Sequence, residues 1–166
     1  NESKSIALAC GSHSGSKIHS REAFKILWEY DIDIDNLKCP INKTSPLEHN
    51  CSGKHAAFLA TCKKMNWPLD SYLKGDHPLQ IEIFRIVSEL LEIPASKINA
   101  ERDDCGAPTL YLKLLEMSRL YSLLSSSENA ELEQISRAIT INPTMISDNN
   151  KFDTEIIKAS HGNVIG

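Results

Sequence analysis

The hydrophobic positions of this chain follow a helical spacing over much of its length. Between residues 79 and 91, apolar side chains recur at i, i+3, i+4 and i+7, and Pro94 follows shortly after. With Asp76 as its N-cap and Pro78 in its first turn, this segment is the most clearly predicted helix of the chain. Further helices are predicted over residues 16–30, over the segment that follows Asn50 as N-cap, over 109–124, over 128–141 and from Thr154 onward.

Two short segments, of which only the first is an apolar run, do not follow the helical spacing. Residues 5–10 end in the glycine- and serine-rich segment 11–15, and residues 98–105 lead into another glycine. Both are predicted as buried strands: the first is too short for a core helix, and the second enters a tight turn. The sum is a helix-rich α+β domain over residues 1–166. Since two strands alone make a poor sheet, we expect this domain to be an internal portion of a longer protein.

Composition and charge exclude several classes of partner. The 166 residues are 41% hydrophobic and 24% charged, and the formal net charge is -4. An acidic balance argues against nucleic acid or an anionic membrane surface as the main partner. No apolar run approaches the roughly 18–20 residues of a membrane span. Five cysteines at irregular spacing are unlike a secreted disulfide framework, so a cytoplasmic protein is expected.

Two motifs hold most of the reactive side chains. The first, C-S-G-K-H at residues 51–55, places a thiol, an amine and an imidazole at the predicted start of a helix. Cys51, Lys54 and His55 stand at i, i+3 and i+4, so on a helix they share one face. The second motif, D-D-C-G-A-P at residues 103–108, places another thiol beside carboxylates and a glycine. Two such clusters in one short chain predict the two halves of a single site.

A metal site is one interpretation of these clusters. Cys51 and Cys105 could bind zinc as thiolates, with a third ligand from the helix that follows Cys51. Imidazole chemistry favours His55 for that place, because Lys54 would have to lose a proton from a pKa of about 10.4. Two simpler interpretations stay open. One is a Cys51–Cys105 disulfide, which a reducing compartment disfavours, and the other is buried thiols beside surface lysine and histidine side chains.

A serine nucleophile is the other chemistry that the sequence offers. Ser12 and Ser14 follow the first predicted strand, where a nucleophile would be exposed. Ser14 and Lys17 match the S-x-x-K pattern of serine hydrolases, in which the lysine one turn on deprotonates the serine. Ser71 and Lys74 match it as well. Because the pattern occurs twice in so short a chain, it carries little weight alone.

Several motifs together resemble those of the asparaginase II family, the rhizobial-type asparaginases. They stand in the family's order and are A-L-A-C-G-S-H-S-G at 7–15, L-E-H-N-C-S-G-K-H-A at 47–56, H-P-L-Q at 77–80, D-D-C-G-A-P-T at 103–109 and K-F-D-T at 151–154. The match runs over nearly the whole chain, and the C-S-G-K-H and D-x-C-G motifs are specific. The sequence is therefore identified as a member of this family.

The resemblance implies a fold, a reaction and a metal. The fold would be like that of the serine β-lactamases and penicillin-binding proteins, with this chain as a helix-rich portion. The reaction would be hydrolysis of L-asparagine to L-aspartate and ammonia, by a homodimer. Zinc would be bound by Cys51, Lys54 and Cys105, so Lys54 replaces His55 as the expected third ligand. His55, Lys54 and Cys105 would also lie on the substrate side.

The resemblance also assigns roles beside the metal. Asp103 would orient water or the substrate amine, and Ser12 would match the family's second active-site serine. The family's nucleophilic serine lies before Asn1, so this chain is expected to hold the zinc half of the site and to be inactive alone. One rival is a catalytically incomplete metal-binding or structural helical domain. Another is a β-lactamase-like serine hydrolase that uses Ser14 and Lys17.

Two positions depart from the family pattern. The glycine that usually precedes the second cysteine is Asp104 here. Aspartate tolerates left-handed backbone geometry better than most residues, so the turn is expected to form. The glycine that often follows the first motif is Ala57, which is a mild change within a helix.

Overall fold

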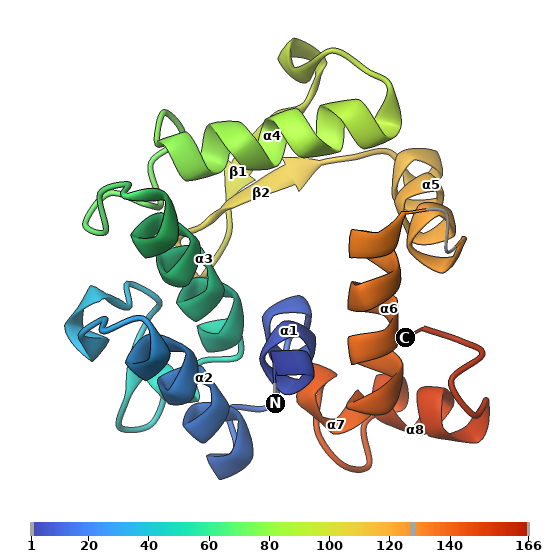
Figure 1. The fold of residues 1–166 in the computed structure, drawn as a ribbon, viewed down its shortest axis with the longest axis horizontal. Coiled ribbons are helices and arrows are strands. Elements are labelled where there is room, and N and C mark those ends of the chain that lie inside the picture. Colours follow the sequence, from blue (N-terminus) through green and yellow to red (C-terminus); the bar gives the residue numbers. More distant parts are fainter. Residues whose placement is uncertain (1, 127–128, 166) are drawn as a thin grey trace.

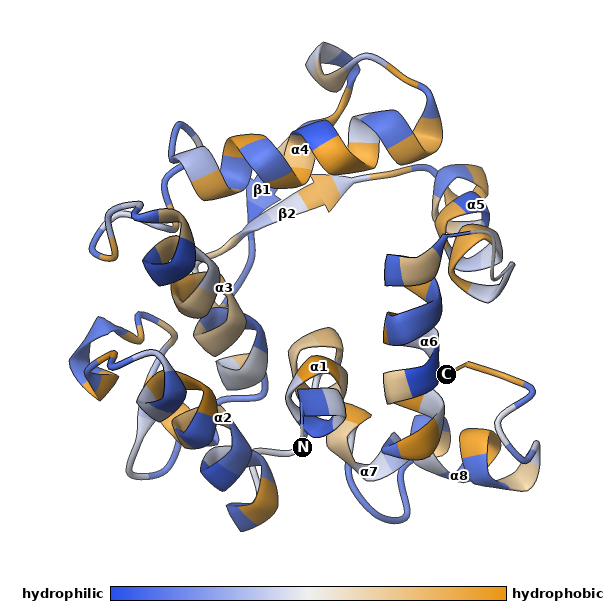
Figure 2. Ribbon diagram, viewed as in Figure 1, coloured by the Kyte–Doolittle hydropathy of each residue, from blue (hydrophilic) through white to orange (hydrophobic). Residues whose placement is uncertain are grey.

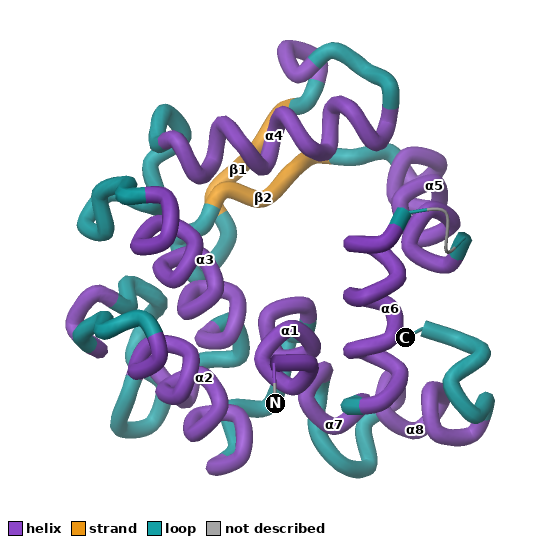
Figure 3. The backbone as a smooth tube through the Cα atoms, in the orientation of Figure 1, coloured by secondary structure: helices purple, strands orange, loops and turns teal. Residues whose placement is uncertain are grey.

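The computed structural model describes residues 2–126 and 129–165. Helices make up most of it, and one two-stranded antiparallel sheet lies beside them (Figures 1 and 3), which confirms the predicted helix-rich α+β class. Within these residues, no helix has both the length and the apolar character needed to cross a lipid bilayer. The elements are α1 (Glu2–Cys10), α2 (Lys17–Glu29), α3 (Ser52–Met65), α4 (Pro78–Leu91), β1 (Asn99–Arg102), β2 (Pro108–Tyr111), α5 (Leu114–Ser125), α6 (Ala130–Ile141), α7 (Pro143–Ile146) and α8 (Phe152–Ala159), with single 3₁₀ turns at Ile34–Asn36, Pro46–Glu48 and Ala95–Lys97.

Helix α1 lies at the centre of the core. It packs against α2 and α3 on one side and against α6 and α7 on the other (Figure 1). Ala7 and Leu8 are completely buried between these neighbours. Directly after α1, Gly11 passes so close to α7 that a Cβ on it would lie 2.2 Å from the carbonyl oxygen of Ile146. The small residues at and after the end of α1 therefore let the helices on both sides approach it.

The strand predicted over residues 5–10 is wrong, because these residues form the second half of α1. Alanine and leucine favour the helix, and a short apolar run does not distinguish a strand from a buried helical segment. Since α1 has helices on several sides, its apolar residues need not follow an amphipathic spacing. The turn after it is found as predicted, and α2 begins after Ser16 as N-cap.

Helix α4 is found where the spacing predicts it, with a different cap. Pro78 occupies the first turn, but the N-cap is His77 rather than Asp76. The Nδ1 atom of His77 accepts a hydrogen bond from the Leu79 N–H at 3.1 Å, as an aspartate oxygen would. Hydrophobic and hydrophilic residues alternate along α4 in Figure 2, as expected for an amphipathic helix.

The second predicted strand, over residues 98–105, is confirmed in its first part as β1, but the prediction that it is buried is wrong, because three of the four β1 residues are exposed. It pairs with β2 in an antiparallel register that places Ala100 opposite Leu110. The helix predicted over 109–124 therefore begins later, at Leu114, because the residues before it belong to the hairpin.

The helices near the end of the chain match their predictions closely. α6 covers the described part of the 128–141 prediction and begins after Asn129, whose side chain accepts a backbone N–H of the first turn. Residues 127 and 128 lie outside the described residues. α8 begins at Phe152, two residues before Thr154. α7, a single turn that starts at Pro143, was not predicted.

Substitution of Gly53 tests the approach of α3 to α1. A Cβ on Gly53 would lie 2.6 Å from both the side chain and the carbonyl oxygen of Leu8. Because neighbouring helices hold α1 on both sides, we expect Gly53→Ala to lower the free energy of unfolding by about 1–3 kcal/mol in chemical denaturation. Gly75→Ala is the matched control, since nothing lies within 4 Å of a Cβ there. Equal stability of the two variants would contradict the close contact.

Candidate metal centre

At the start of α3, some side chains of the C-S-G-K-H motif are buried in the core and others are partly exposed. Cys51, not Asn50, is the N-cap residue, so the cap predicted at Asn50 is wrong by one position. Ser52 and Gly53 are buried: the Ser52 hydroxyl donates to a main-chain carbonyl at 2.8 Å, and Gly53 contacts α1. Cys51 and Lys54 are half-buried. These two side chains are thus left available to meet another segment.

The second motif forms the turn between β1 and β2. The Asp103 N–H donates to the Ala107 carbonyl at 2.9 Å, and Gly106 has the left-handed backbone that the turn needs, with φ of 87°. Asp104 is not among the residues with positive φ, so replacing the family's glycine there introduces no backbone strain. Cys105, in the middle of the turn, is only 1% exposed.

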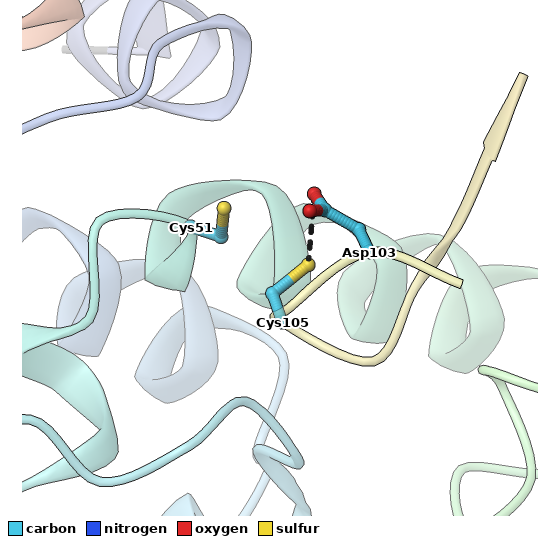
Figure 4. A group of neighbouring side chains, drawn as sticks. All are labelled: Cys51, Asp103 and Cys105. Carbon is cyan, nitrogen blue, oxygen red and sulfur yellow. Dashed lines mark hydrogen bonds between the residues drawn. The ribbon is translucent and has the colours of Figure 1, made fainter. Parts of the chain in front are cut away.

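Two thiols and a carboxylate meet where the two motifs come together (Figure 4). The sulfurs of Cys51 and Cys105 and a carboxylate oxygen of Asp103 all lie within 4.8 Å of one another. The Cys105 thiol donates to Asp103 Oδ2 at 3.6 Å, and Lys54 Nζ lies 3.8 Å from the same oxygen. Four of the predicted site residues are therefore brought together, from segments far apart in the sequence.

The chemistry of these donors suits a zinc ion. Zinc sites in proteins combine thiolate sulfur with nitrogen or carboxylate oxygen, and their ligand atoms surround one point. Burial raises the pKa of the Cys51 thiol to about 11, and the nearby charge of Lys54 opposes that increase. Without a metal, the thiol therefore keeps its proton at neutral pH. A bound dication reverses this balance, because coordination deprotonates a thiol.

Ser12 lies beside this cluster, and Asn50 connects the two. Asn50 Nδ2 donates to Ser12 Oγ at 2.8 Å and to Cys51 Sγ at 3.6 Å. From the sequence, Asn50 was predicted only as a helix N-cap. The one signal that could have marked it was its position directly before the first cysteine of the motif.

A comparison with protein-family models matches the L-asparaginase II model over residues 1–166. The chain belongs to the L-asparaginase II family. No match was found among curated proteins. The family match confirms the resemblance read from the motifs, and it indicates a hydrolase of the asparaginase type with a small-molecule substrate.

In this L-asparaginase II chain, His55 belongs to the core rather than to the thiol cluster. It is completely buried, and its Nδ1 lies 2.7 Å from the hydroxyl of Tyr72. That hydroxyl accepts the Lys38 N–H at 2.9 Å, so its own proton is free to reach His55 Nδ1. Within the described residues, His55 Nε2 has no hydrogen-bond partner. Burial, followed by the charge of Lys54, lowers the pKa of His55 to about 3, so the imidazole is neutral at physiological pH.

Neither S-x-x-K pair of the L-asparaginase II chain forms a serine–lysine contact. Ser14 Oγ donates instead to a carboxylate oxygen of Asp148. Ser71 and Lys74 are joined by a main-chain hydrogen bond of 2.9 Å, which closes a turn. Neither Ser14 nor Ser71 therefore has the lysine partner that this type of nucleophile requires.

Proposed function

We propose that this chain carries the zinc-binding part of an amidohydrolase site that converts L-asparagine to L-aspartate and ammonia. The observation that carries the proposal is the meeting of Cys51, Cys105 and Asp103 at one point. Membership of the L-asparaginase II family supports the substrate class. A cluster of two thiols and one carboxylate alone would support metal binding, and the family match adds the reaction.

Zinc, in this proposal, is held by Cys51, Cys105 and Lys54. The two sulfurs supply the charge that favours zinc, and the family resemblance supports Lys54 as the third ligand. The amine lies 3.8 Å from Asp103, so it is already beside the cluster. Asp103 competes for the same place, because a carboxylate is ionised at neutral pH and also binds zinc. If Lys54 binds the metal, the Asp103 carboxylate is left free to orient the substrate.

The residues of this chain would bind and orient the substrate. When bound, zinc supplies a positive charge that favours the carboxylate and amino groups of an amino acid. The Asp103 side chain is 42% exposed and can accept a hydrogen bond from the substrate's ammonium group. A serine then attacks the side-chain amide, ammonia leaves, and water hydrolyses the resulting acyl-enzyme.

The nucleophilic serine is proposed to lie outside these 166 residues. The bond between Ser14 Oγ and Asp148, which engages the hydroxyl of one S-x-x-K serine, supports this view. The helices would then be the helical portion of a serine β-lactamase-like fold, and the complete enzyme would be a homodimer, as the resemblance implies.

Zinc content tests the two thiol ligands. We expect elemental analysis to find about one zinc per chain after equilibration with the metal and removal of the excess. Cys51→Ala and Cys105→Ala should each lose it, because a thiolate supplies both charge and a bond. Cys10→Ala is the matched control and should keep its zinc. A chain without zinc, or a Cys105→Ala variant that still binds it, would contradict the site.

The third ligand is tested by comparing two substitutions. We expect Lys54→Met to weaken zinc binding by more than about tenfold in competition with a chelator, since even residues around the ligands matter by about 10–100-fold. Asp103→Asn should weaken it less. Lys64→Met, a change of the same kind at an exposed position of α3, should have no effect. The opposite order of the two effects would assign the carboxylate, not the amine, as the ligand.

Activity of the chain alone tests where the nucleophile lies. We expect little or no ammonia release from L-asparagine, and no labelling of Ser14 by a serine-reactive phosphonate. Turnover that disappears in Ser14→Ala would instead support the serine hydrolase alternative. Calorimetry with L-asparagine then distinguishes a substrate-binding site from a metal-binding structural domain. Binding that requires zinc and Cys105 supports a substrate site, and zinc binding without asparagine binding supports a metal-binding structural domain.

A further inference from the structure

Asn50 occupies a fixed position between two segments that the site needs. It precedes the N-cap residue of α3, and its carbonyl accepts the N–H of His13 at 3.2 Å. The segment that contains Ser12 is therefore tied to Asn50 through the main chain. The following residue, Cys51, is held by a side chain instead, because its N–H donates to the His49 imidazole Nδ1 at 3.1 Å. These two bonds fix the main chain on either side of the Asn50 side chain.

The side-chain amide of Asn50 uses one nitrogen for two hydrogen bonds. Nδ2 lies 2.8 Å from Ser12 Oγ and 3.6 Å from Cys51 Sγ. A primary amide has two hydrogens on this nitrogen, so each acceptor can receive its own. The longer distance suits the second bond, because sulfur has a larger radius than oxygen. One planar group thus fixes the position of a hydroxyl relative to a thiol.

The bond from Asn50 also decides what Ser12 can do. Because Ser12 Oγ accepts the amide hydrogen, the hydroxyl keeps its own proton for another acceptor. In residues 2–126 and 129–165, no protein group accepts that proton, and Ser12 is exposed. The hydroxyl is therefore able to donate to an oxygen of a small molecule, either a carbonyl or a carboxylate oxygen, that lies beside Cys51.

The segment on which Ser12 lies is closely packed at both ends. A Cβ on Gly11 would lie 2.2 Å from the Ile146 carbonyl oxygen, and one on Gly15 would lie 1.8 Å from the Glu48 carbonyl oxygen. The Ser14 N–H also donates to the Ser147 carbonyl at 2.9 Å. Packing and hydrogen bonds at both ends of this segment already place the main chain of Ser12. The Asn50 amide therefore has only to orient the Ser12 hydroxyl.

We infer that Asn50 is a positioning residue of this site, which sets the Ser12 hydroxyl and the Cys51 sulfur in one arrangement for an oxygen-bearing amino-acid substrate. The inference rests on the proposed function for its metal and substrate, but its two hydrogen bonds can be tested without either. The N–H···S bond places the partially positive amide hydrogen of Asn50 beside the Cys51 sulfur, which would bind the metal. Residues that donate to a ligand in this way commonly change metal affinity about 10–100-fold when replaced.

Nitrogen-15 NMR of the metal-free chain tests the two hydrogen bonds. The side-chain NH₂ group of Asn50 gives two proton signals at one nitrogen frequency, identified by their loss in Asn50→Leu. We expect Ser12→Ala to move one of these proton signals and Cys51→Ala to move the other, while Cys10→Ala moves neither. Signals that stay in place in both the Ser12→Ala and Cys51→Ala variants would overturn the inference.

Cobalt in place of zinc tests the consequence for the metal. We expect Asn50→Leu and Asn50→Asp to weaken cobalt binding about 10–100-fold and to shift the thiolate-to-cobalt absorption to lower energy, since a sulfur without its hydrogen bond gives up an electron more easily. Asn163→Asp, an equal charge change at an exposed position, should alter neither. An unshifted band in both Asn50 variants would overturn the role at the metal. A parent chain that takes up no cobalt would refute the proposed metal site, and the NMR result would still decide the positioning role.

Discussion

The contact between α1 and α3 at Leu8 and Gly53 is the constraint on which the site depends. Because Gly53 has no side chain, the first turn of α3 lies directly on the main chain of α1. This contact places Cys51, at the start of α3, next to the segment that leaves α1 and carries Ser12. A larger residue at either position of the contact would move the N-cap thiol relative to that serine. The glycine of the C-S-G-K-H motif is therefore a packing requirement as much as a part of the chemistry.

A second requirement is that the β1–β2 turn reaches the same point, and the buried Tyr72 contributes to this. Its hydroxyl contacts His55 of α3 and accepts the Lys38 N–H, while its carbonyl accepts from Gln80 of α4 at 2.8 Å. The next residue, Leu73, would lie 3.4 Å from a Cβ on Gly106 in the turn. Through its side chain and its main-chain carbonyl, this one residue thus links α3, α4 and the loop that contains Lys38. His55 has a structural reason to stand in the motif.

The sequence allowed much of the fold and of the site to be predicted, and the errors have physical reasons. Helix α4 could be predicted because it has an amphipathic face, a proline at its start and another after its end. The apolar run at 5–10 could not, because α1 packs against helices on two sides and a short apolar run of this kind resembles a buried strand. The two motifs predict a common site, and their thiols do lie together. The positions of His55 and Asn50 could not be predicted, since spacing along a helix does not reveal which side another segment, such as Tyr72 or Ser12, will cover.

The weakest part of the fold is also the part that a metal would hold. Two strands of four residues, largely exposed, are marginal as an independent sheet. In the described residues, β1 and β2 contact each other more extensively than either contacts a helix. The turn between them nevertheless buries Cys105 beside Cys51, whose own burial raises the pKa of its thiol. A cation shared by the two sulfurs would remove this penalty and join the turn to α3. Metal binding and docking of the hairpin would then stabilise each other, because each supplies the geometry that the other requires.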